Sequence, residues 1–200
     1  MKLAIIIGAT RAGRQSPKQA KWVHKTAAAI EDVEPEIIDL KDYSMPMFDE
    51  PLSPRYNLDR KVDARAQRWL SKLEEFDAYI FVTPEYNHSI PGVLKNAIDY
   101  ITWEIQRKPA GIVSHGSAGG ARAQVQLKVI LSESRAVPIP IPSPLAMVGM
   151  SDKIDDNGNL AEELIDQPHG PQAALDEMLH GLKWYSDALA AARVRELVAV

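Results

Sequence analysis

The stretch VPIPIPSP, residues 137–144, carries a proline at every second position. Backbone amides of successive residues in a β-strand point alternately to its two sides, so these prolines remove the donors from one side only. A strand inside a sheet needs donors on both sides, whereas an edge strand needs them on one. If the stretch is a strand, it therefore lies at the edge of a sheet with its donor-free side outward.

Apolar runs of strand length alternate with helical periodicity along the rest of the chain. The predicted strands are residues 2–7, 36–40, 78–82, 110–114 and 136–141. The predicted helices are residues 17–30, 59–73, 91–101, 121–132 and 172–198, and residues 41–58 form a long loop. This alternation is typical of a parallel sheet with helices on both faces. Because we find no repeat or linker, we expect residues 1–200 to form a single domain.

Two orders of such a parallel sheet compete. The flavodoxin-like order 2-1-3-4-5 leaves the fifth strand at an edge, whereas the dinucleotide-binding order continues to a sixth strand. The proline stretch is the fifth predicted strand and requires an edge, so it favours the flavodoxin-like sheet. Ligands bind such sheets at the carboxyl ends of the strands, where the strand order reverses. The loops that follow the strands are therefore the candidate site.

Composition excludes several classes of function. The 200 residues carry a net charge of −4 with no cluster of Lys and Arg, which favours neither nucleic acid nor an anionic membrane as a partner. No apolar run approaches the roughly 18 residues of a membrane helix. The chain has no cysteine, and its five histidines lack metal-ligand spacing, so we expect no metal site. A cytoplasmic location fits this composition.

The loop GATRAGRQSPK, residues 8–18, joins the first strand to the first helix. Its amides and the positive end of the helix favour an anion. The ATPase phosphate motif fails at positions 14 and 15, and the dinucleotide fingerprint fails at position 10. The hydroxyls of Thr10 and Ser16 and the guanidinium groups of Arg11 and Arg14 still suit a phosphomonoester. Alternatively, the arginines are solvated surface charges and Ser16 is only the N-cap.

The loop that begins TPEYNHSIPG, at residue 83, follows the third strand. Tyr86 lies beyond the strand end, which favours a stacking or interface role over a core role. Glu85 has no second carboxylate near it in sequence, so we expect a backbone or interface role rather than acid catalysis.

The loop SHGSAGGARA, residues 114–123, follows the fourth strand. Its three glycines, Gly116, Gly119 and Gly120, allow close approach of the backbone to a flat ligand. Ordinary turn chemistry explains them equally well. Ser117 lacks the first glycine of the serine-hydrolase elbow and is not expected to be a nucleophile.

Three motifs together resemble the NAD(P)H-dependent FMN reductase family of flavodoxin-like proteins, which includes quinone, azo-dye and chromate reductases. The motifs are GATRAGRQSPKQAKWV, TPEYNHSIPGVLKNAIDY and SHGSAGGARAQVQLKVIL, within residues 1–145. The resemblance implies an FMN phosphate held by Thr10, Arg11, Arg14 and Ser16. It implies a flavin edge lined, with backbone amides, by the segment Pro84, Glu85, Tyr86 and Asn87, and a pyrimidine end at Gly116, Ser117, Gly119 and Gly120. The chain departs from the family at two positions. Members commonly have Ser where Ala9 stands here and Tyr where His115 stands.

The resemblance also implies an activity. NADPH or NADH would reduce bound FMN, which would pass a hydride to a small quinone-like acceptor in a ping-pong mechanism without a catalytic side chain. The family is usually dimeric or tetrameric, so we expect a homodimer or homotetramer. Segment 146–170 lies outside the motifs and is expected to shape the substrate mouth or an interface. Two alternatives are a flavodoxin-type FMN electron carrier and a flavin-free binding protein on the same fold.

Overall fold

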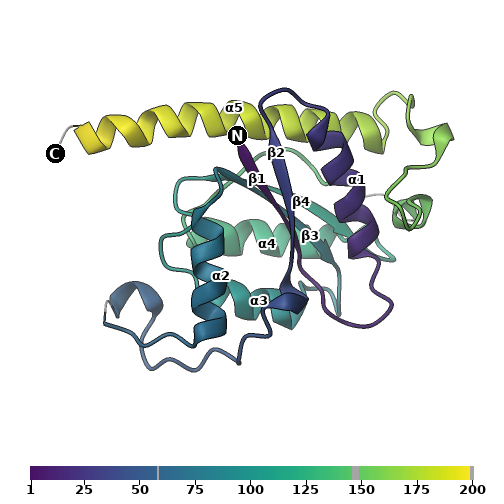
Figure 1. Cartoon of the computed structure of the whole chain (residues 1–200). Coiled ribbons are helices and arrows are strands. Elements are labelled where there is room, and N and C mark those ends of the chain that lie inside the picture. Colours follow the sequence, from purple (N-terminus) through teal and green to yellow (C-terminus); the bar gives the residue numbers. More distant parts are fainter. Residues whose placement is uncertain (58, 146–148, 199–200) are drawn as a thin grey trace.

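The computed structural model describes residues 1–57, 59–145 and 149–198. They contain a five-stranded parallel sheet of order β2-β1-β3-β4-β5, which confirms the predicted flavodoxin-like order (Figure 1). The strands are β1 (Lys2–Ile7), β2 (Glu34–Asp39), β3 (Ala78–Pro84), β4 (Pro109–His115) and β5 (Val137–Pro138).

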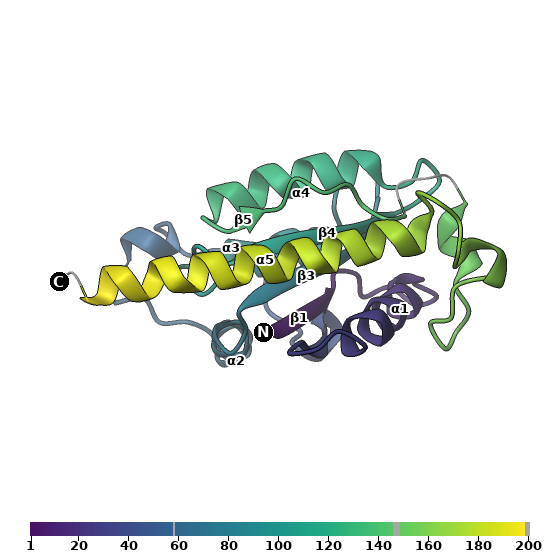
Figure 2. The same ribbon diagram turned by 90° about the horizontal axis from the view of Figure 1, so that it is seen from above.

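Helices cover both faces of the sheet (Figure 2). The α-helices are α1 (Ser16–Ala28), α2 (Ala64–Glu74), α3 (Gly92–Asp99), α4 (Ala121–Glu133) and α5 (Pro171–Val198). The short 3-10 helices are η1 (Leu40–Asp42), η2 (Pro54–Tyr56), η3 (Met150–Lys153) and η4 (Glu162–Leu164). Among the helices that the structure describes, none offers the apolar stretch that a bilayer crossing requires.

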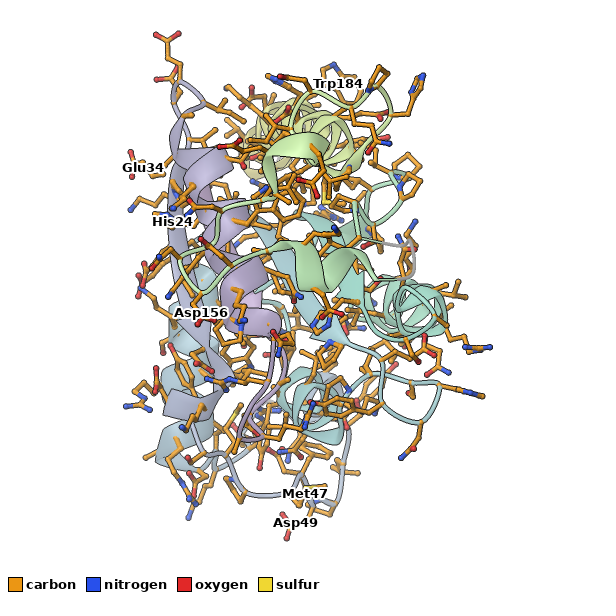
Figure 3. All side chains as sticks on the ribbon, turned by 90° about the vertical axis from the view of Figure 1, so that its right-hand side faces the viewer. His24, Glu34, Met47, Asp49, Asp156 and Trp184 are labelled. Atoms are coloured by element: carbon orange, nitrogen blue, oxygen red, sulfur yellow. The ribbon has the colours of Figure 1, made fainter. Side chains whose placement is uncertain are left out.

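The alternation of side chains along the central strands creates two apolar cores. Leu3, Ile5 and Ile7 of β1 pack with α1 and α5, whereas Ala4 and Ile6 pack with α2, α3 and α4. Burial on both faces explains why the central strands are almost wholly apolar in sequence. The C-terminal part of α5 extends past the sheet (Figures 1 and 2), and Trp184 on its outer surface is 65% exposed (Figure 3).

The fifth strand lies at the predicted edge but is much shorter than predicted. Ladder pairing covers Val137–Pro138 instead of residues 136–141. The amides of Val137 and Ile139 donate inward to Lys108 and Ala110 carbonyls at 2.9 Å, so the intervening proline faces outward as expected. Farther along, a side chain replaces the backbone ladder, because Ser143 Oγ accepts from the amide of Ser114 at 2.8 Å.

Two helix starts differ from prediction for reasons of capping. Ser16 was expected to be the N-cap of α1, but Gln15 occupies that position, without a side-chain capping bond, and Ser16 is already helical. The predicted helix 59–73 begins only at Ala64, because the Asp63 carboxylate accepts from the amide of Arg65 at 2.9 Å and caps it there.

The segment after residue 154 folds back onto α1. Asp156 forms an ion pair with Lys18 at 2.8 Å, and it lies beside α1 in Figure 3. Gly158 has φ +78°, and a Cβ there would lie 2.5 Å from Lys21 Cβ and 2.7 Å from the amide nitrogen of Trp22. The turn at residues 155–159 therefore packs directly against the helix backbone, which only glycine allows.

This contact predicts that alanine lowers stability more at Gly158 than at Gly13, where the added Cβ would meet no neighbour. Gly158→Ala combines a left-handed backbone with a steric overlap, so it should lower the free energy of unfolding by more than about 2 kcal/mol. Gly13 has φ +70° but no atom within 4 Å of its Cβ position, so Gly13→Ala should cost only about 1 kcal/mol. Urea unfolding of both variants measures the difference, and equal losses would show that the turn does not pack tightly on α1.

Candidate functional site

The carboxyl ends of β1, β3 and β4 open onto a cavity of about 790 Å³. It lies at the point where the strand order reverses, and its volume is typical of a small-ligand pocket. The residues around it are Arg11, Gln15, Pro84, Glu85, Tyr86, Asn87, His115, Gly116, Ser117, Gly149 and Asp152. The predicted site residues missing from this lining are Thr10, Arg14, Ser16, Gly119 and Gly120.

Arg11 is the first-loop arginine that reaches the cavity. Its Nε donates to the Tyr86 hydroxyl at 2.8 Å, and its guanidinium carbon lies 5.6 Å from the centre of the Tyr86 ring. The structure shows no ion pair between Arg11 and any described carboxylate. Arg11 therefore joins the first and second loops and keeps its positive charge uncompensated.

The backbone of the first loop is unusually rich in free donors. Within the described part of the chain, the amides of residues 10–15 find no acceptor. They precede the first turn of α1, where the helix dipole adds a positive potential. This arrangement, together with Arg11, is an anion cradle of the kind that holds a phosphate.

The other first-loop side chains are engaged elsewhere. Arg14 is largely buried, donates to the Ala9 carbonyl at 2.6 Å and forms an ion pair with Asp39 of β2. Its charge is thus already compensated, contrary to its predicted phosphate role. Thr10 is half-buried and lines a separate cavity of about 160 Å³. Ser16 is fully buried, so its hydroxyl does not reach the cavity.

Ser16 instead pairs with the end of β4. Its Oγ lies 3.0 Å from His115 Nε2, and the His115 ring is 5% exposed where it lines the cavity. Burial, aided by the nearby positive charge of Arg11, lowers the pKa of His115 to about 4. The imidazole is therefore neutral at pH 7.

The second loop forms a tight hairpin turn. The amides of Tyr86 and Ser89 donate to each other's carbonyls at 2.9 and 3.0 Å, with φ 49° at Asn87 and 66° at His88, as in a type I′ turn. The amide of Glu85 donates to the His115 carbonyl at 2.8 Å. The amides of Glu85 and Tyr86 therefore already have acceptors within the chain, whereas the prediction placed them against a ligand. The amide of Asn87 meets no acceptor among the described residues.

The Glu85 side chain caps α4. Its carboxylate accepts from the amide and guanidinium of Arg122, both at 3.0 Å, and more weakly from the amide of Ala123. Burial raises the pKa of Glu85, but the hydrogen bonds from Arg122 and Ala123 together outweigh burial and lower it. Glu85 is thus a fixed anion whose side chain anchors the second loop to α4, whereas the sequence predicted a backbone or interface role for it.

The glycines of the third loop divide into two kinds. Gly116 lines the cavity beside Ser117. Gly120 has φ +70°, and a Cβ there would lie 2.5 Å from the backbone nitrogen of His115. Gly119 has φ +68° and donates to the Gly116 carbonyl at 3.0 Å. Turn chemistry and close packing against β4 thus explain Gly119 and Gly120, whereas ligand contact remains a prediction for Gly116 and Ser117.

Four lining residues were not predicted: Gln15, His115, Gly149 and Asp152. Gln15 belongs to the first loop and directly precedes α1, and this position was the signal by which the sequence could have identified it as a lining residue. Gly149 and Asp152 come from segment 146–170, so this segment does shape the cavity mouth, although residues 146–148 lie outside the described ranges. The described residues contain no group of three or more potential ligands that could hold a metal ion.

Comparison with known proteins gives consistent matches. Residues 1–149 match the family described as NADPH-dependent FMN reductase. The chain is 37% identical over 127 residues to an NAD(P)H-dependent FMN reductase of Schizosaccharomyces pombe, an alignment that covers 64% of each chain. It is 32% identical over 139 residues to a quinone reductase of Escherichia coli K12, which covers 66% of this chain and 69% of that one.

A solved structure shows the same fold. FerB, a flavoenzyme NAD(P)H:(acceptor) oxidoreductase from Paracoccus denitrificans, superposes with a TM-score of 0.72 at 23% identity and covers 92% of this chain and 98% of its own. The present chain spans 64% of the length of the S. pombe relative, which is less than two thirds.

The buried neutral imidazole predicts a pH effect on stability. The folded-state pKa of His115, about 4, lies below the ordinary value near 6.5, so the unfolded chain binds a proton first as pH falls. The stability that His115 contributes is complete above pH 6.5 and is lost as pH falls towards 4, by up to about 3 kcal/mol. Urea unfolding across this window should show a smaller pH dependence in His115→Gln, and identical slopes would contradict the neutral assignment.

Proposed function

Because the chain belongs to the NADPH-dependent FMN reductase family, we propose that it is an NAD(P)H-dependent oxidoreductase that holds FMN in this cavity and reduces small quinone-like acceptors. One observation carries the proposal: Arg11 and Gln15 of the anion cradle line the same cavity as a set of residues suited to a flat ligand. FMN combines a terminal phosphomonoester with a flat ring system.

The chain's own groups fit the phosphate end of FMN. The free amides of residues 10–15 and the guanidinium of Arg11 would hold the phosphate, without a metal ligand in the loop. Tyr86 accepts a hydrogen bond from Arg11 and so keeps the guanidinium at the cavity edge. Arg14, with its charge paired to Asp39, shapes the loop instead of binding the anion.

The remaining lining residues would orient the ring system. The free amide of Asn87 and the exposed Ser117 hydroxyl supply hydrogen-bond donors, and Gly116 lets the backbone approach a flat surface. When bound, FMN supplies the redox chemistry, since it accepts and donates hydride equivalents. Glu85 is ionised within its own hydrogen bonds, and His115 is neutral, so we assign no catalytic side chain.

The lining leaves room for a second molecule. Among the described lining residues Tyr86 is the sole Phe, Tyr or Trp, and its hydroxyl accepts a hydrogen bond from Arg11. Gly116 and Ser117 are too small to cover a ring. A nicotinamide and an acceptor would therefore occupy the same open side in turn, which supports a ping-pong mechanism.

We also propose that the chain forms a homodimer or homotetramer. Val125 and Val129 lie one helical turn apart on α4 and are 63% and 68% exposed, an apolar pair that a second copy of this chain would cover. Sedimentation velocity decides between a monomer and these assemblies.

The first test concerns FMN itself. The purified protein should show the absorption bands of bound flavin and should oxidise NADPH or NADH in the presence of a quinone. Arg11→Ala should weaken FMN binding roughly tenfold or more, because a charge-assisted hydrogen bond is worth about 1.5 to 3 kcal/mol, and it should leave riboflavin binding nearly unchanged. Flavin fluorescence titration measures both affinities.

A matched control is Arg65→Ala on α2, where Arg65 pairs with Asp63 away from the cavity. It should change neither affinity. Equal losses of FMN and riboflavin in Arg11→Ala would show that Arg11 supports the loop and not the phosphate. Absence of flavin binding would favour a flavin-free binding protein on this fold.

The second test concerns the order of the two half-reactions. Double-reciprocal plots of NADPH oxidation at several quinone concentrations should be parallel, as expected for one site used in turn. Intersecting lines would show that both substrates bind together. Bound flavin without any quinone-dependent NADPH or NADH oxidation would favour the electron carrier.

A further inference from the structure

The buried pair of Ser16 and His115 lies at the base of the cavity, outside the roles assigned so far. We infer that His115 contacts the bound flavin by presenting Nδ1–H to one of its oxygen acceptors, and that Ser16 is a positioning residue that fixes this tautomer. The identity of the ligand rests on the proposed function. The tautomer does not, because it follows from contacts within the chain.

Burial of Ser16 decides the direction of its hydrogen bond. Ser16 is fully buried, and within the described ranges its hydroxyl has a single partner, His115 Nε2 at 3.0 Å. If the ring donated to Ser16, the hydroxyl hydrogen would be buried without an acceptor. Buried donors without a partner are rarer and more costly than acceptors with an unused lone pair. Ser16 therefore donates, and Nε2 accepts.

An accepting Nε2 requires a neutral ring with its proton on Nδ1. Both nitrogens of an imidazolium are donors, so a charged His115 could not accept from Ser16. The lowered pKa of His115, which burial and the positive charge of Arg11 cause, agrees with a neutral ring. The one remaining proton is then carried by Nδ1.

The Nδ1 atom keeps access to the cavity. The ring lines the cavity, and Nδ1 has no partner among the residues that the structure describes. It is also absent from the buried polar atoms that lack a partner, so it is not sealed in the interior. Nδ1–H is thus a donor without an acceptor among the described residues, and a molecule bound in the cavity can supply one.

The backbone fixes the position of the ring. The His115 carbonyl accepts from the amide of Glu85 at 2.8 Å, and Gly120 packs so tightly on His115 that a Cβ would lie 2.5 Å from its nitrogen. With Ser16 holding Nε2, the ring is restrained from both ends. Such restraint makes a donor selective, because it cannot turn away from a poorly placed acceptor.

A neutral, fixed N–H does not need a charged acceptor, and the part of the cavity away from Arg11 would present it with the flavin carbonyl or ribityl hydroxyl groups. This role differs from that of Arg11, whose charge addresses the phosphate. Loss of the His115 donor should therefore lower the affinities for FMN and for riboflavin by the same factor, whereas loss of Arg11 should lower the affinity for FMN alone.

Nitrogen-15 NMR of the histidine side chains tests the tautomer in the flavin-free protein. Long-range proton–nitrogen correlation at pH 7 should show His115, identified by its absence in His115→Gln, as the neutral Nδ1–H form. In Ser16→Ala the ring should lose this preference and populate the Nε2–H form, which a purely structural role of Ser16 would not produce. A charged ring, an Nε2–H form in the wild type, or an unchanged tautomer in Ser16→Ala would overturn the inference.

Flavin titration tests the contact itself. His115→Phe keeps a ring but removes the donor, so it should weaken the binding of FMN and of riboflavin alike by roughly tenfold. His180 is exposed on the surface of α5, so His180→Phe should leave both affinities unchanged and serves as the control. Addition of riboflavin should also shift the Nδ1 resonance of the wild type. The contact is refuted, while the proposed function stands, if His115→Phe binds flavin with unaltered affinity and riboflavin leaves the Nδ1 resonance of the wild type unshifted. If no flavin binds the wild type, the proposed function itself fails.

Discussion

The site depends on the backbone at the end of β4, where three loops meet one residue. The His115 carbonyl accepts from the amide of Glu85, which fixes the start of the second loop. Gly120 packs against the same residue with a left-handed backbone that leaves no space for a side chain, which fixes the third loop and the start of α4. The His115 ring reaches Ser16 at the end of the first loop. A displacement of this residue would therefore move all three loops that follow β1, β3 and β4.

Charge compensation decides which polar groups remain available to a ligand. Arg14 is paired with Asp39, and Glu85 is held by Arg122 and the start of α4. These pairs connect the loops to the sheet and to a helix, and they leave the charge of Arg11 without a partner among the described residues. The loop amides at residues 10–15 likewise find no acceptor within the described part of the chain. A negatively charged group is thus attracted to one end of the cavity only.

The sequence predicts the frame of this site better than its individual contacts. Alternating prolines 138–144 indicate an edge strand, and together with the alternation of strands and helices they favour the observed order of the sheet and so indicate the loops that surround the site. The contacts of Arg14 and Ser16 could not be predicted in this way, because their partners, Asp39 and His115, lie 25 and 99 residues away in sequence. Hydroxyl, guanidinium and glycine residues in a loop look alike whether they face a ligand or the chain itself. Only the fold decides between the two.

The mouth of the cavity is linked mechanically to the phosphate end through α1. Gly149 and Asp152 line the mouth, and the turn that follows them is held on α1 by the Lys18–Asp156 ion pair and by a hydrogen bond of 2.6 Å from Lys25 to Asn159. The same helix begins at Ser16, directly after the anion cradle. The segment that limits the mouth and the loop of the anion cradle are therefore both attached to α1. The tight contact at Gly158 makes this connection stiff, because the turn touches the helix backbone and not a flexible side chain.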